Sequence, residues 1–145
     1  MGICLILIFA LLAVLLFLLV LFERQESASG SLFTKLPFGV YAAWVTAVAI
    51  VNFAIFLKFE DVELSTSAWN MLGAVLIVFA SVLAVIVRWR LKNYLYPFTI
   101  GWALTAIAIK QGSNTAIVIT CAVGVVICLV TAGSFVVDLK DSTSE

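Results

Sequence analysis

Long runs of apolar residues alternate with short polar breaks along the whole chain. A membrane-spanning helix needs about 20 apolar residues, and the polar breaks leave room for about five such segments. The pattern therefore predicts an all-α membrane protein, a compact bundle of about five transmembrane helices that forms a single polytopic domain over residues 1–145. The spans are expected at about residues 3–22, 37–57, 68–87, 94–109 and 115–137, followed by a polar tail over residues 138–145.

Composition excludes a soluble protein. Of the 145 residues, 65% are hydrophobic and 11% are charged, and the mean hydropathy is +1.26. A soluble domain of this length needs far more polar surface. Eight basic residues balance eight acidic ones, which argues against a nucleic-acid partner and leaves the lipid bilayer as the expected environment.

The chain lacks the usual residues of catalytic and metal sites. It contains no His, which removes the commonest haem or chlorophyll ligand and the commonest catalytic base. Its three cysteines, Cys4, Cys121 and Cys128, all fall within apolar runs and are expected to be small buried hydrophobic residues. No carboxylate, His or Lys is expected at mid-membrane, where such groups mark chemistry or ion paths. We therefore expect no catalytic residue, no metal site and no enzyme.

The flanks of the predicted spans indicate how the chain sits in the membrane. The cluster Arg88, Arg90 and Lys92, with an interleaved Trp, is expected to contact lipid headgroups rather than nucleic acid. Six basic residues flank the ends of spans one, three and five, and only two, Lys58 and Lys110, lie on the opposite side. This asymmetry predicts an amino terminus outside and a carboxyl terminus inside. Whether the first span is retained or cleaved as a signal peptide stays open, although its apolar core is long for a signal peptide.

The last span carries a ridge of small side chains at every fourth position. A ridge of this kind lets another helix approach closely, so we expect packing against a neighbouring helix of the same chain, with a dimer motif as the alternative. The ridge consists of Thr120, Gly124, Cys128 and Ala132.

Span 37–57 is less uniformly apolar than the others and is the candidate for binding. At about 100° per residue, Tyr41, Trp44, Val48 and Asn52 fall within a sector of roughly 80° on one helix face. The amide of Asn52 is expected to bond to another helix or to a bound molecule, because an unpaired amide is costly in hydrocarbon.

Two segments resemble the tryptophan-rich sensory protein/translocator protein (TspO/MBR) family. The first is similar to the last core helix of that family and matches at Pro37, Tyr41, Trp44, Val45, Thr46, Ala49 and Asn52. Its spacing is that of an extended branch, with Ala43 where that branch has Gly. The second, from Trp102 to Lys110, resembles the segment W-A-L-x-G-I-x-x-K of the same branch, with Ala106 in place of Gly. The resemblance covers the carboxy-terminal half of the long family members.

The resemblance implies a non-catalytic membrane protein and two alternative functions. Members of the family bind porphyrins, sterols and synthetic ligands, largely through three earlier helices that have no counterpart in the resemblance. We therefore favour a small accessory or scaffold subunit that contacts other membrane subunits. The alternative is a receptor in which Tyr41, Trp44, Asn52 and Trp102 line a pocket for a porphyrin, a sterol or another apolar ligand. The sequence does not call for a particular cofactor. A bound lipid, porphyrin or pigment is compatible with both functions.

Overall fold

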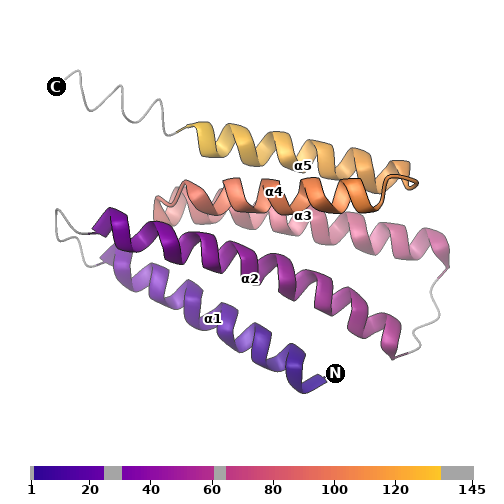
Figure 1. Ribbon diagram of the computed structural model, residues 1–145, viewed down its shortest axis with the longest axis horizontal. Coiled ribbons are helices and arrows are strands. Elements are labelled where there is room, and N and C mark those ends of the chain that lie inside the picture. The colour runs from indigo at the N-terminus through magenta and orange to yellow at the C-terminus, as the bar shows by residue number, and fades with distance from the viewer. Residues whose placement is uncertain (1, 25–30, 61–64, 135–145) are drawn as a thin grey trace.

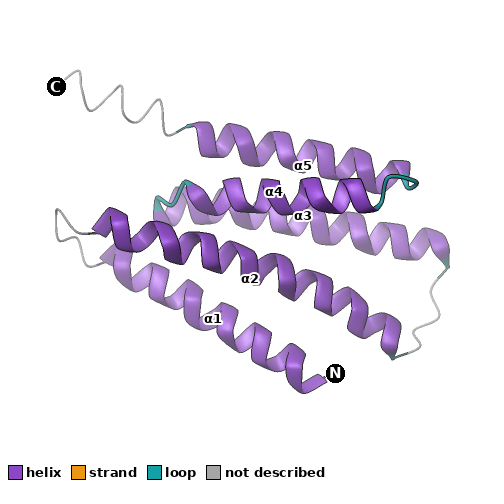
Figure 2. Cartoon of the chain, viewed as in Figure 1, coloured by secondary structure: helices purple, strands orange, loops and turns teal. Residues whose placement is uncertain are grey.

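The computed structural model describes residues 2–24, 31–60 and 65–134, and these residues form helices and short connections without a strand (Figure 2). The helices are α1 (Gly2–Arg24), α2 (Ser31–Phe59), α3 (Thr66–Leu91), α4 (Leu95–Lys110) and α5 (Thr115–Gly133). Four of them, all except α4, are long and apolar enough to cross a membrane. The predicted all-α membrane bundle of five helices is confirmed.

The helices lie side by side with their long axes roughly aligned (Figure 1). Helices α1 and α5 form opposite edges, and α3 lies behind α4 in this view. Helix α1 packs mainly on α2, α2 packs on α4, and α5 packs on both α3 and α4, whereas α2 and α3 touch only sparsely. The sparse contact between α2 and α3 leaves space between them.

Small residues form much of the core because they let helix backbones approach one another. Ala42, Ala43 and Ala84 are fully buried. The largest buried side chain, Tyr96 of α4, places its hydroxyl 2.8 Å from the Thr46 hydroxyl of α2. Thr46 Oγ1 already donates to the Ala42 carbonyl at 2.8 Å, so the Tyr96 hydroxyl is the donor of the bond between the two helices.

Helix α2 extends beyond the span expected at about residues 37–57. It begins at Ser31, so Pro37 lies inside it, and its part long and apolar enough to cross a membrane is Leu36–Phe59. The apolar pattern marks where the chain enters the membrane, whereas helical hydrogen bonding continues into the polar flank before it. Helix α5 ends at Gly133; the remaining residues of the predicted last span, 135–137, and the polar tail lie outside the described residues.

Side-chain caps define two helix starts at the same end of the bundle. Ser65 Oγ accepts a hydrogen bond from the Ala68 N–H at 3.3 Å, as expected for a residue that precedes α3. Asn114 Oδ1 accepts from the Ile117 N–H at 3.4 Å and caps α5. Since α2 and α4 end where α3 and α5 begin, four helix termini meet at this end (Figure 1).

Candidate functional site

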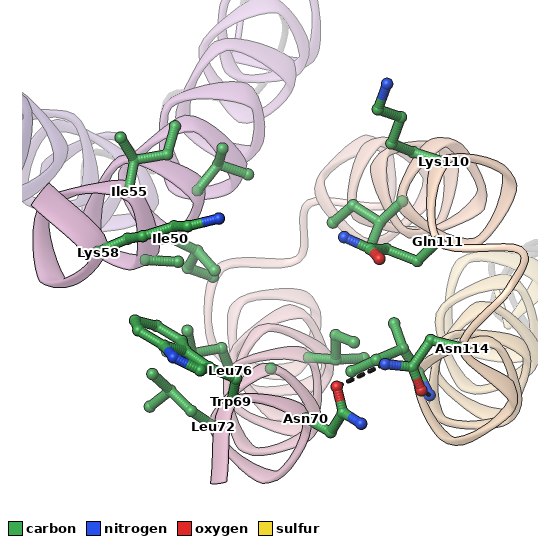
Figure 3. A pocket seen from close by; sticks show the side chains of 16 residues that line it. Ile50, Ile55, Lys58, Trp69, Asn70, Leu72, Leu76, Lys110, Gln111 and Asn114 are labelled. Carbon is green, nitrogen blue, oxygen red and sulfur yellow. Dashed lines mark hydrogen bonds between the residues drawn. The ribbon is translucent and has the colours of Figure 1, made fainter. Parts of the chain in front are cut away.

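A half-open pocket of about 520 Å³ lies where these four helix termini meet (Figure 3). Ligand pockets for small molecules commonly have volumes of about 300–1,000 Å³, so this one is large enough for a ligand. Its walls are α2, α3, the end of α4 with the following turn, and the start of α5. The lining residues are Ile50, Val51, Ala54, Ile55, Lys58, Trp69, Asn70, Leu72, Gly73, Leu76, Ile77, Ile107, Lys110, Gln111, Asn114 and Ile117.

The polarity of the lining changes with depth. The polar members lie in the terminal turns of the helices, at the rim, and are Lys58, Asn70, Lys110, Gln111 and Asn114. Aliphatic residues more than two turns from the helix ends, such as Ile50, Leu76 and Ile77, form the inner part. The pocket therefore has a polar rim at one end of the bundle and an apolar floor inside it.

A hydrogen bond between two amides holds one side of the rim. Asn114 Nδ2 donates to Asn70 Oδ1 at 2.5 Å and so joins the start of α5 to α3 (Figure 3). Because Asn114 Oδ1 accepts from the Ile117 backbone, the orientation of the Asn114 amide is determined by its two partners. The rim on this side is preorganised by contacts within the chain.

The opposite side of the opening carries a cation. The Lys58 side chain extends from α2 towards the opening, and the Gln111 amide extends towards it from the end of α4 (Figure 3). The Trp69 ring lies beside the same opening, whereas the Lys110 side chain points away from it. An amine and a side-chain amide thus face one another across the mouth of the pocket.

A smaller void of about 20 Å³ continues the floor inward between α2, α3 and α4. It shares Ile50, Leu76, Ile77 and Ile107 with the pocket, and its lining is entirely apolar. Packing around the floor is therefore incomplete, and modest side-chain movements would lengthen the apolar part of the site.

The candidate ligand-binding residues lie elsewhere. Tyr41, Trp44 and Trp102 are exposed by 49%, 53% and 69%, and none of them lines the pocket or the smaller void. In a membrane bundle, such side chains face lipid or a partner. Asn52 is half-buried, and its Nδ2 donates to the Val48 carbonyl at 2.9 Å, so its partner lies in its own helix rather than in another. The structure does not bring these four residues to one cavity.

The basic cluster at the end of α3 contains two kinds of residue. Arg90 and Lys92 are exposed, and their contact with lipid headgroups stays a prediction. Arg88 is only 7% exposed: its Nη2 donates to Ser134 Oγ at 2.9 Å, and its guanidinium lies 3.9 Å from the Tyr94 ring centroid. The expectation that Arg88 contacts headgroups is therefore corrected, because its side chain turns inward to tie α3 to the end of α5.

The ridge on α5 lies partly in the core. Gly124 and Cys128 are buried, and a Cβ added at Gly124 would meet Ser81 of α3 and Leu104 of α4. Thr120 and Ala132 are only partly buried, while Ile117 and Cys121 complete the buried face. The buried face is thus rotated slightly from a strict four-residue repeat, as the 3.6-residue helical period requires.

The pocket was not predicted from the sequence, in which Lys58 and Lys110 indicate only the topology. A signal was present, because polar residues gather at the ends of spans two and four and the starts of spans three and five. Alternate loops of a helical bundle share one membrane face, so this clustering could have suggested a polar rim.

The comparisons with known proteins agree with this architecture. A family model described as TSPO-like protein matches residues 1–134. The match includes all five helices, whereas the residues that carry the resemblance lie in α2 and α4. No curated protein and no solved structure gives a significant match.

Proposed function

We propose that this chain, which belongs to the TSPO-like protein family, is a non-catalytic membrane protein that binds a small apolar or amphiphilic ligand in the pocket between α2, α3, α4 and α5. The observation that carries the proposal is the pocket itself, which combines a suitable volume, an apolar floor and a few polar groups at the rim. The accessory function was favoured because the pocket-forming helices of the family have no counterpart in the resemblance. The chain's own helices nevertheless line a pocket, which favours ligand binding.

Ligand binding is testable through the fluorescence of Trp69. This residue lines the pocket, while the other three tryptophans, Trp44, Trp89 and Trp102, are exposed and can be replaced by Phe. A neutral long-chain alcohol brominated at mid-chain quenches a nearby indole. In a non-ionic detergent, we expect this alcohol to quench the single-tryptophan protein saturably.

A pocket-filling substitution separates specific binding from partition into the micelle. Ala54 lines the pocket, so Ala54→Phe should weaken binding by about 10-fold or more, because the ring occupies space that the ligand needs. Ala122 is exposed on α5, outside the pocket, and Ala122→Phe should leave binding unchanged. Equal quenching in both variants would show that the alcohol reaches Trp69 only from the detergent micelle and does not bind in the pocket, which would contradict the proposal.

An accessory subunit remains the second candidate function, and the exposed Tyr41, Trp44 and Trp102 favour it as groups available to partner helices. The same preparation discriminates between the two candidates. Absence of saturable quenching, together with stoichiometric co-purification of a defined membrane protein in mild detergent, would support the accessory function.

We further propose that the amino terminus lies outside, so that the pocket opens on the outer face of the membrane. Ser113 is exposed in the turn between α4 and α5, at the same end as the pocket. In intact cells of an expression host, with Cys4 replaced by Ser, we expect a membrane-impermeant maleimide to label Ser113→Cys. Arg90→Cys, at the other end of the bundle, should react only after permeabilisation. The reverse pattern would contradict this orientation.

A further inference from the structure

The geometry points to a more specific occupant: a single-chain amphiphile with a carboxylate head, held with its head between Lys58 and Gln111 and its chain along the apolar floor. This inference rests on the proposed ligand-binding function and adds the chemical class of the ligand. It is carried by the charge at the rim, by the direction of the polarity gradient and by the shape of the floor.

The described residues that line the rim carry a net positive charge. Lys58 and Lys110 are cations, and none of these lining residues is acidic. The acidic residue described nearest to Lys58 in the chain, Glu60, is exposed and does not line the pocket. Helices α3 and α5 begin at this end while α2 and α4 end here, so their dipoles offset one another, and the positive charge of the lining comes from the lysines. An anionic group is the charge complement of these two lysines.

The side chains at the mouth suit a head with one negative charge. Only one of the two lysines, Lys58, extends towards the opening, and the group facing it is the neutral amide of Gln111 (Figure 3). Within the described part of the chain, Lys58 has no ion-pair partner. A carboxylate can accept hydrogen bonds from an ammonium and from an amide N–H at the same time, since it has two acceptor oxygens.

The interior suits an alkyl chain. Ile50 and Lys58 lie eight positions apart on α2 (58 − 50), which corresponds to about 12 Å along the helix axis. The floor extends from Ile50 and Ile107 into the smaller apolar void. A ligand with its charge at one end and a narrow apolar chain matches this gradient, whereas a ligand with polar groups at both ends would leave one of them without a partner on the floor.

Lys58 also has a structural explanation, because a cation in the last turn of α2 complements the helix dipole. The test must therefore measure preference for an anionic ligand and not stability alone. The single-tryptophan protein is titrated at about pH 8, where a carboxyl is ionised, with a mid-chain brominated fatty acid and with the brominated alcohol of equal length. We expect the acid to bind about 5-fold more tightly than the alcohol, the size of effect an exposed charge pair provides.

Substitutions locate the source of the preference. Lys58→Gln should abolish the preference for the acid over the alcohol, whereas Lys58→Arg should retain the preference. Arg90→Gln removes the same charge at the opposite end of the bundle and should have no effect, which controls for the net charge of the protein. A preference that survives Lys58→Gln would overturn the inference.

Two further outcomes are decisive. Equal binding of acid and alcohol by the unsubstituted pocket, with Ala54→Phe still blocking both, would overturn the carboxylate assignment while leaving the proposed function intact. Absence of binding by either ligand would overturn both. An alkyl phosphate of equal length serves as a third ligand, and tighter binding of the phosphate than of the carboxylate would refute the choice of head group.

Discussion

Replacing Gly39 by alanine is expected to destabilise the protein by about 2 kcal/mol or more, although alanine is the better helix former. A Cβ at Gly39 would overlap the side-chain amide of Asn93. Asn93 is 1% exposed, and its Oδ1 accepts a hydrogen bond from the Tyr96 N–H at 3.1 Å at the start of α4. Adding one methyl group to α2 must therefore displace a buried amide and leave a backbone donor of α4 unsatisfied. Unfolding by a denaturing detergent, followed by circular dichroism, measures the loss.

Two variants show whether the expected loss comes from this contact. Gly133→Ala places a Cβ where no other atom lies within 4 Å, and it should change stability by less than about 0.5 kcal/mol. Asn93→Ala removes the group that Gly39 accommodates. In the double variant, the cost of Gly39→Ala should fall by about 1 kcal/mol or more, because residues in direct contact do not behave additively. Additive costs would show that the contact does not limit the substitution.

Gly124→Leu is expected to separate α5 from the rest of the bundle. A Cβ alone at Gly124 would lie 2.7 Å from Ser81 Oγ and 2.8 Å from Leu104 Cδ1. Neither neighbour moves easily, because the Ser81 hydroxyl donates to the Ile77 carbonyl at 2.9 Å and Leu104 is 2% exposed. Three further carbon atoms must force the helices apart, at a cost of about 3 kcal/mol or more.

Thermal stability in mild detergent measures this effect, with Ala122→Leu as the matched control on the exposed side of α5. We expect Gly124→Leu to lower the transition midpoint by more than 10 °C (about 2–8 °C is expected per kcal/mol), and Ala122→Leu to leave it nearly unchanged. Similar midpoints for both variants would show that α5 does not depend on close approach at Gly124.

The predicted helices follow from local properties of the chain and are largely correct. Each apolar run is long enough to require internal backbone hydrogen bonding in a membrane, and a helix satisfies this within one segment. The family resemblance is also supported, since two short matches in α2 and α4 indicated the family that matches residues 1–134. Helix ends were less predictable: α2 begins before Pro37 because hydrogen bonding does not stop where apolarity stops.

For the candidate site, the sequence predicts which residues share a helix face, but not which neighbour each face contacts. Helical periodicity shows that Tyr41, Trp44 and Asn52 share a face, but it does not show which neighbour that face meets. The structure leaves Tyr41 and Trp44 exposed, and it pairs Asn52 with its own helix. Conversely, Arg88 belongs by sequence to an exposed basic cluster, and only the position of Ser134 and Tyr94 explains its burial.

The membrane environment and the all-α class could be predicted from the sequence, because they depend on the length and composition of individual segments. The family could be predicted from the residues matched in α2 and α4. Which helices touch, which faces are buried and where space remains depend on how the helices pack, and these features required the structure. Helix α2 packs on α1 and α4 and touches α3 only sparsely, so the pocket forms between α2 and α3, and the end of α4 and the start of α5 complete its wall. Lipid and protein interiors are equally apolar, and hydrophobicity therefore does not distinguish a lipid-facing surface from a helix contact. Steric fit makes that distinction, through small residues such as Gly39 and Gly124 whose partners lie far away in the sequence.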